Sequence, residues 1–219
     1  MANSGAEISN SGIVISLLKK ERDGEAIAVL SRAFWQDPVL TFFLDDARRR
    51  KFAYRAFFGD VINSNRRFGH VYAAFDQRRL VGVAAWRPPD AGLPTNYERL
   101  QCLIAEWKIR SLFPGKGRRI FEGFKATQAL HPACPHWYLC FVGVEPRMHA
   151  MGIGTELLRP VLQQANRDGT CCYLETPFPQ SHAFYERLGF QIARKGHPFA
   201  CASPLWTMTR NCIRTVHDE

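Results

Sequence analysis

Val144-Glu-Pro-Arg-Met-His-Ala-Met-Gly-Ile-Gly154 is the stretch that decides the fold, because it joins a strand to a helix. The run 136–144 is almost continuously apolar, as in a strand at the buried centre of a sheet. Residues 152–168 carry apolar side chains at helical spacing, and Gly169 ends that helix. A buried strand leading into an amphipathic helix predicts a sheet covered by helices.

Gly152 and Gly154 stand at the start of this helix. Without Cβ atoms they let a ligand approach the backbone, and the first helical turn offers free N–H groups and the positive end of the dipole. These properties favour binding of a pyrophosphate. A tight packing turn would explain the two glycines equally well, and neither a P-loop nor a complete Rossmann glycine motif is present.

Working outward, strand and helix patterns alternate along the chain. We expect strands at 13–18, 69–75, 80–86, 136–144, 171–175, 189 onward and 205–210. We expect helices at 23–36, 46–62, 97–112, 120–130, 152–168 and 182–188. The prediction is an α/β (α+β) fold with a mixed sheet of six to seven strands flanked by helices. It forms one domain over 13–212, after a disordered tail at 1–12.

The composition is that of a globular protein with a basic surface, with 46% hydrophobic residues and a net charge of +9. Charge alone carries no recognition chemistry, and no zinc finger, RNP-like motif or basic zipper accompanies it, so nucleic acid is not an expected partner. No apolar run reaches the about 18–20 residues that span a bilayer, and no secretory signal is visible. We therefore expect a cytoplasmic protein without a membrane partner.

The chain has seven cysteines, which we expect to be reduced thiols in a cytoplasmic setting. His131, Cys134, His136 and Cys140 lie close enough in sequence to suggest a metal site. Neither a CxxC nor an HxxxH pair completes it, and a strand over 137–144 would point these side chains in different directions. We expect no metal.

The order of the pieces resembles that of the GNAT acetyltransferases. It consists of the buried strand, Glu-Pro, the GxG helix, a second strand and then Phe184-Tyr-Glu-Arg-Leu-Gly-Phe190. The ending Pro204-Leu-Trp-Thr-Met-Thr-Arg210 and the early Ala33-Phe34 with Asp37-Pro38 resemble most the branch that contains puromycin N-acetyltransferase. The resemblance is strong over 137–210 and weaker over 13–46. It implies the GNAT fold and acetyl-CoA as co-substrate.

The resemblance further implies that the glycine stretch is the family's Gln/Arg-x-x-Gly-x-Gly/Ala pyrophosphate loop. Here His149 replaces the Gln/Arg, and Ala150 and Met151 follow it. The backbone donors survive these changes. Many members carry Asn where this chain has Phe178, whereas the puromycin-type branch keeps a polar residue at the position of Ser181. The implied cofactor-binding residues are Val142, Gly143, Val144, His149, Ala150, Met151, Gly152, Ile153, Gly154, Thr155 and Ser181.

Tyr185 has two interpretations. Its place on an amphipathic helix is typical of a core tyrosine. The family resemblance implies instead that its hydroxyl lies near the cofactor sulfur and protonates the leaving thiolate. It also implies that a backbone N–H within 141–144 polarises the acetyl carbonyl. Since attack by the amine is direct in this family, we expect Cys140 to be a core cysteine and not a nucleophile.

The acceptor amine needs a group that orients it or accepts its proton. Glu175, at the end of a strand, is our first candidate, although such a carboxylate is often simply solvated. Asp37, Glu145 or a chain of waters are alternatives. We expect Asp37, Phe42 and Trp137 to line the substrate site.

The predicted function is therefore acetyl-CoA-dependent N-acetylation of a primary amine on a small molecule, by direct attack in a ternary complex. A protein N-terminus or lysine is an alternative acceptor for the same fold. A CoA-binding regulatory module without turnover is the alternative from another functional class.

Overall fold

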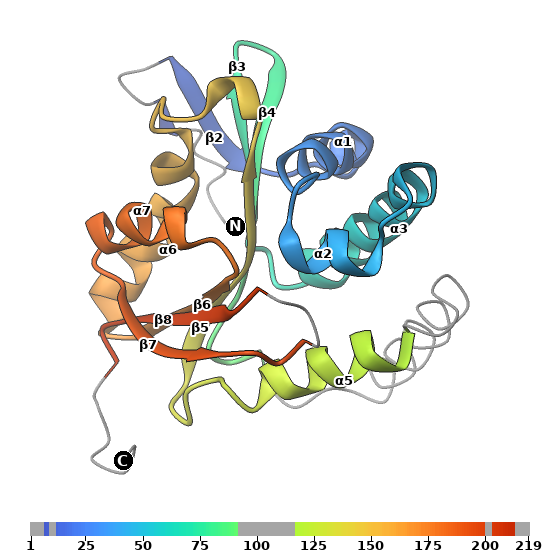
Figure 1. The fold of residues 1–219 in the computed structure, drawn as a ribbon. Coiled ribbons are helices and arrows are strands. Elements are labelled where there is room, and N and C mark those ends of the chain that lie inside the picture. The colour runs from blue at the N-terminus through green and yellow to red at the C-terminus, as the bar shows by residue number, and fades with distance from the viewer. Residues whose placement is uncertain (1–6, 9–11, 92–116, 200–202, 213–219) are drawn as a thin grey trace.

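The computed structural model describes residues 7–8, 12–91, 117–199 and 203–212 (Figure 1). Within these residues all strands join one sheet in the order β1-β2-β3-β4-β5-β6-β8-β7. The strands are β1 (Glu7–Ile8), β2 (Ile13–Leu17), β3 (Val71–Asp76), β4 (Arg79–Arg87), β5 (His136–Val144), β6 (Cys171–Thr176), β7 (Gln191–Gly196) and β8 (Leu205–Arg210). Only β5 and β6 pair in parallel, so the predicted mixed α/β fold is confirmed.

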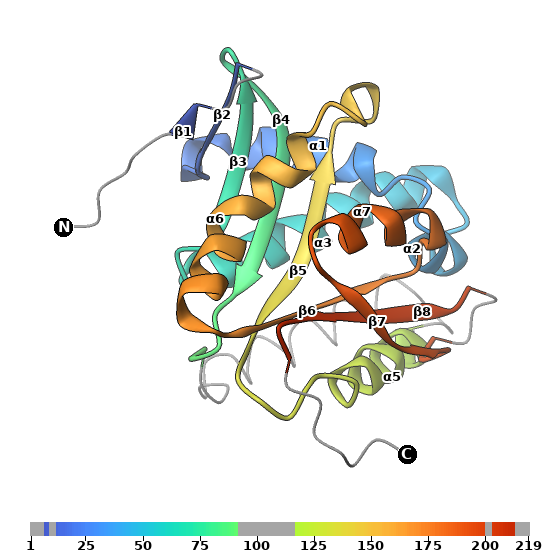
Figure 2. The same ribbon diagram turned by 90° about the vertical axis from the view of Figure 1, so that its left-hand side faces the viewer.

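Helices cover both faces of this sheet. On one face lie α6 (Ile153–Asp168) and α7 (His182–Arg187), and on the other lie α1 (Asp23–Ala33), α2 (Pro38–Phe43) and α3 (Ala47–Arg66) (Figures 1 and 2). A further helix, α5 (Gly117–Gln128), lies beside β7 and β8. Short 3-10 turns precede α1, α6 and α7 at 20–22, 146–148 and 179–181.

Two apolar cores fill the spaces between the sheet and its helices. Trp137 and Leu139 of β5 pack with α6, whereas Phe141 packs with α1 and α3 on the opposite face. A register shift between Ala85 and Trp86 of β4 leaves Cys140 as the extra residue of β5. A bulge of this kind reverses the faces of the residues that follow, so β5 contributes to both cores.

The structure departs from the expected boundaries at the N-terminal tail and at the end of α3. Glu7 and Ile8, expected in a disordered tail, pair with Ile15 and Val14 as β1, so the sheet has eight strands and not six to seven. The helix expected to end near residue 62 continues to Arg66. The helical pattern at 97–112 lies outside the described residues. No helix among the described residues is long and apolar enough to cross a membrane.

Candidate active site

The centre of the site is the place where β5 and β6 separate. Their parallel pairing begins at His136–Cys171 and ends at Leu139–Leu174, while β5 stays paired with β4 up to Val144. The last five residues of β5, 140–144, therefore have one edge without a β6 partner. Figure 2 shows the two strands spreading apart below α7. The backbone groups of Val142 and Val144 face this free edge. Those of Gly143 face β4 instead, because the Glu145 N–H bonds to the Val81 carbonyl and alternate residues of an antiparallel pair point the same way. The expectation that Gly143 offers its backbone to the cofactor is therefore wrong.

The predicted pyrophosphate loop connects β5 to α6. Ala150 and Gly152 adopt left-handed backbone conformations, with φ of 63° and 78°. Gly152 caps α6 without any side-chain hydrogen bond to the helix, and the first intrahelical bond runs from Glu156 N–H to the Gly152 carbonyl. The N–H groups of Ile153, Gly154 and Thr155 precede that bond, so no helical carbonyl accepts from them. This arrangement fits a pyrophosphate.

The side chains of the loop differ in their contacts and exposure. The His149 ring folds back to place Nε2 3.2 Å from the Val144 carbonyl oxygen, so it closes the loop onto the end of β5. Met151 is exposed. A Cβ at Gly152 would meet no atom within 4 Å, whereas a Cβ at Gly154 would lie 3.1 Å from Cζ of Phe184. Gly154 therefore admits a neighbouring ring of α7, while Gly152 serves the backbone turn.

Glu175 lies on the face of the sheet opposite α6, because its neighbour Leu174 points into the core beneath that helix. Its Oε2 accepts a hydrogen bond of 2.8 Å from the Tyr138 hydroxyl, and its Oε1 accepts one of 2.9 Å from the Tyr173 hydroxyl. Burial, and then the charge of Glu175, raise the pKa of both tyrosines well above the ordinary value. Both phenols thus stay protonated and hold the carboxylate in place.

Two histidines that we did not predict as site residues extend this cluster. His131 Nε2 lies 3.5 Å from Glu175 Oε1, and His131 Nδ1 lies 3.0 Å from His136 Nε2. The expectation that these histidines point in different directions is therefore wrong, because the turn before β5 folds His131 back over the strand. Polar or aromatic residues at the alternate positions 136 and 138 of one strand, and at 173 and 175 of the next, are the pattern that indicates such a cluster on one face of the sheet.

Tyr185 is almost buried on α7, in contact with the rings of Phe184 and Phe190. Burial raises its pKa above the ordinary value of a phenol. It is therefore protonated at neutral pH and has a proton to donate. Ser181 precedes α7 and makes no side-chain capping bond to it.

Glu145 is bound elsewhere: its carboxylate forms ion pairs with Arg32 and Arg79. Asp37 is buried, and its Oδ1 caps α2 by accepting from the N–H groups of Val39 and Leu40 at 2.9 and 2.8 Å. Burial raises the pKa of Asp37 to about 6. Of the other two expected substrate residues, Phe42 is exposed on α2, while Trp137 is buried in the core beneath α6.

We expected all cysteines to be reduced thiols, but one pair forms a disulfide. Cys171 and Cys212 form a disulfide that joins the start of β6 to the residue two beyond β8. The Sγ atoms of Cys134, Cys171 and Cys212 lie within 4.8 Å of one another. Cys140 has a pKa raised by burial to about 12, which keeps it a thiol and argues against a nucleophile.

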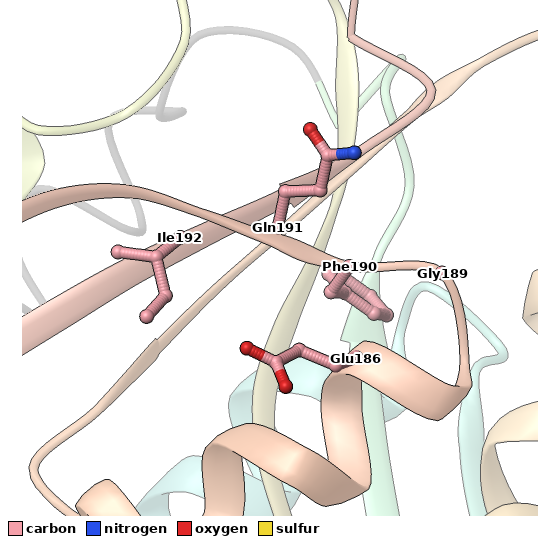
Figure 3. A pocket seen from close by; sticks show the side chains of 5 residues that line it. All are labelled: Glu186, Gly189, Phe190, Gln191 and Ile192. Atoms are coloured by element: carbon pink, nitrogen blue, oxygen red, sulfur yellow. The ribbon is translucent and has the colours of Figure 1, made fainter.

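A surface hollow lies where α7 leads into β7 (Figure 3). Its lining consists of Glu186, Gly189, Phe190, Gln191 and Ile192. None of the predicted site residues lines it, although Phe190 of its lining contacts the Tyr185 ring.

The sequence matches a family of known proteins. The model of the Acetyltransferase (GNAT) family matches residues 24–190. An uncharacterised N-acetyltransferase of Schizosaccharomyces pombe is 25% identical over 176 residues, which are 76% of this chain and 69% of that protein.

Solved structures show the same fold. A Corynebacterium glutamicum protein described as histone acetyltransferase HPA2 and related acetyltransferase has a TM-score of 0.69 at 24% identity, over 92% of this chain and 98% of its own. Arylalkylamine N-acetyltransferase 2 of Aedes aegypti has a TM-score of 0.65 at 13% identity, over 92% and 99%. The chain belongs to the acetyltransferase (GNAT) family and is an acetyl-CoA-dependent acyltransferase.

Proposed function

We propose that this enzyme transfers the acetyl group of acetyl-CoA to a primary amine of a small molecule, by direct attack in a ternary complex. The observation that carries the proposal is the Glu175 carboxylate, fixed by the hydroxyls of Tyr138 and Tyr173 next to the point where β5 and β6 separate. It is a proton acceptor on the face of the sheet opposite the α6 helix.

Acetyl-CoA supplies an activated acetyl thioester. The N–H groups at the start of α6 bind its pyrophosphate, and the free edge of Val142 and Val144 orients its pantetheine arm and polarises the acetyl carbonyl. Tyr185 donates a proton to the leaving sulfur. Because burial raises the pKa of this phenol, its position at the sulfur and not its acidity has to drive the transfer.

We propose that the acceptor carries its amine on an apolar or aromatic body. Glu175 is the carboxylate of the cluster, its side chain is only 11% exposed, and aromatic and imidazole rings surround it. Phe42 adds an exposed ring on α2. The name of the Aedes relative, an arylalkylamine acetyltransferase, is consistent with this class. We further propose that the chain is most like the puromycin-type branch, which rests on the motifs at 33–38 and 204–210.

The test is release of free thiol from acetyl-CoA with three sets of acceptors: aryl-substituted primary amines, aliphatic polyamines, and peptides with a free N-terminus or lysine. We expect the highest kcat/KM for the aryl amines, and a loss of about 10²-fold or more in kcat for Glu175→Gln. Turnover confined to peptides, or binding of acetyl-CoA without thiol release for any acceptor, would contradict the proposal.

A further inference from the structure

The hydrogen bonds of His136 decide which nitrogen of each neighbouring histidine carries the proton. His136 Nδ1 lies 2.8 Å from the backbone carbonyl oxygen of Cys134. A carbonyl only accepts, so Nδ1 of His136 must carry a hydrogen. The other nitrogen of neutral His136, Nε2, is therefore an acceptor.

The tautomer of His136 also determines the tautomer of His131. Since His136 Nε2 accepts, His131 Nδ1 must be the donor across their 3.0 Å contact. In its neutral form His131 then has no hydrogen on Nε2. That atom is buried, makes no hydrogen bond within the described residues, and lies 3.5 Å from Glu175 Oε1. His131 Nε2 without a hydrogen and the Glu175 carboxylate oxygen are both acceptors, so neither can donate to the other. A buried acceptor that receives no hydrogen bond costs free energy.

We propose that His131 Nε2 takes up, through Glu175, the proton that the acceptor amine loses, and that His136 passes it to solvent. This inference rests on the proposed function and assigns His131 and His136 as positioned proton carriers behind Glu175. A proton that Glu175 accepts on Oε1 lies between Oε1 and His131 Nε2. It therefore provides the hydrogen bond donor that these two acceptor atoms lack.

The proton count is balanced at each step. The amine nitrogen forms the new bond to the acetyl carbon and loses one proton to a Glu175 oxygen, while the bond between the acetyl carbon and the CoA sulfur breaks and the leaving sulfur takes the proton of Tyr185. Glu175 returns to the carboxylate by giving this proton to His131 Nε2, and the resulting imidazolium gives its Nδ1 proton to His136 Nε2. His136, which is partly exposed, then releases its Nδ1 proton to water, which leaves both rings neutral with hydrogen on Nε2. Proton exchange with water that returns both rings to the Nδ1–H form completes the cycle.

The charged and titratable groups around the pair agree with this role. Glu175 and Tyr173 face it from β6, Tyr138 faces it from β5, and Cys134 precedes it in the turn. Arg194 of β7 acts on Tyr173. Burial lowers the pKa of His136, and its contact with His131 lowers it further, while the Cys134 carbonyl and Glu175 raise it. Burial thus favours the neutral form of His136, in which Nε2 is free to accept from His131 Nδ1.

The first test is nitrogen NMR of the histidine rings in the full-length protein. We expect both neutral rings to carry hydrogen on Nδ1. Glu175→Gln should lower the pKa of His136, whereas His131→Gln should raise it, because each change removes a named influence. A neutral His131 that is protonated on Nε2 would overturn the proposal, whether or not the protein acetylates amines.

The second test is the pH profile of kcat with the best acceptor. His131→Gln keeps a hydrogen-bonding side chain but carries no proton, so we expect kcat at pH 7 to fall at least about tenfold while the KM for acetyl-CoA stays the same. Imidazole added to His131→Ala should restore turnover as its neutral form increases with pH. His70→Gln is the matched control, because His70 is also half-buried with a lowered pKa but contacts Tyr72 and Trp137 instead.

The outcomes separate the two proposals. A loss of kcat in Glu175→Gln with an unchanged His131→Gln overturns the relay and leaves the function standing. If the wild-type enzyme acetylates no amine, the proposed function itself fails, and the NMR result still decides whether His131 presents an open acceptor to Glu175.

Discussion

Arg32 of α1 places its Nε 2.9 Å from both carboxylate oxygens of Glu145, the residue that follows β5. The Glu145 side chain is 9% exposed and that of Arg32 is 51% exposed. The backbone N–H of Glu145 also donates to the Val81 carbonyl of β4 at 2.8 Å. The start of the loop proposed to bind pyrophosphate is thus held by a helix and a strand from the N-terminal half of the chain.

Glu145→Gln should weaken acetyl-CoA binding several-fold and lower stability by about 1–2 kcal/mol, because the half-exposed Arg32 loses its partner and the loop loses its anchor. Calorimetry and urea unfolding measure the two effects. Glu25→Gln, which breaks a surface pair with Arg22, is the control and should change neither appreciably. Equal behaviour of the two variants would show that the Arg32–Glu145 pair does not anchor the loop.

Gly152→Ala should lower stability by about 1–2 kcal/mol and weaken acetyl-CoA binding strongly. The φ of 78° at this residue is disfavoured for any side chain, and the turn presents the first N–H groups of α6. Gly24→Ala, inside α1 with open space around the new Cβ, should leave binding unchanged. Calorimetry on both variants, with folding checked by circular dichroism, measures this. Full affinity in Gly152→Ala would remove the loop from the binding site.

Tyr185→Phe should lower kcat by about 10²–10⁴-fold and keep acetyl-CoA affinity within a few-fold, since only the proton donor is lost. Tyr54→Phe is the control: this buried tyrosine of α3 donates to the Phe34 carbonyl at 3.0 Å and should affect stability but not kcat. Steady-state kinetics and a binding isotherm separate the two. Normal turnover in Tyr185→Phe would leave it a core residue.

Asp37 should make stability depend on pH. Its folded-state pKa of about 6 lies above the ordinary value of 3.8, so the folded protein binds more protons than the unfolded chain between these values. Stability contributed by the protonated group is therefore lost as pH rises from about 4 to 6, by roughly 2–3 kcal/mol in all. Asp37→Asn keeps the oxygen that caps α2. It should remove this decrease of the unfolding free energy with pH, as measured by urea unfolding at several pH values. An unchanged slope would contradict the shifted pKa, and an unchanged KM for the amine would exclude Asp37 from the acceptor site.

Reduction of the Cys171–Cys212 disulfide should lower stability by about 4 kcal/mol or less, because the bond closes a loop of 41 residues. Cys212→Ser should lower stability by the same amount, whereas Cys134→Ser should leave the disulfide and the stability unchanged. Thermal unfolding with and without a reductant, together with thiol counting, measures this. A wild-type midpoint that does not respond to the reductant would show that the disulfide is not formed in solution.

Local patterns were sufficient for much of the architecture. The apolar run of β5, the helical spacing of α6 and the residues between them predict a strand–loop–helix unit, because each depends on neighbours within a few residues. The left-handed Gly152 at the helix start follows from the same stretch. The resemblance to the GNAT family rested on these segments, and the match over 24–190 confirms that family, while the puromycin-type branch stays a prediction.

The sequence by itself thus determined the fold and the loop proposed for the pyrophosphate. Only the tertiary structure decided that Glu145 pairs with Arg32 and that Asp37 caps α2. It alone brought His131 and His136 to Glu175, because that meeting depends on the parallel register of β5 with β6. Register and the bulge at Cys140 are set by packing between segments far apart in the chain, and a period-2 pattern within one strand contains no information about its partner.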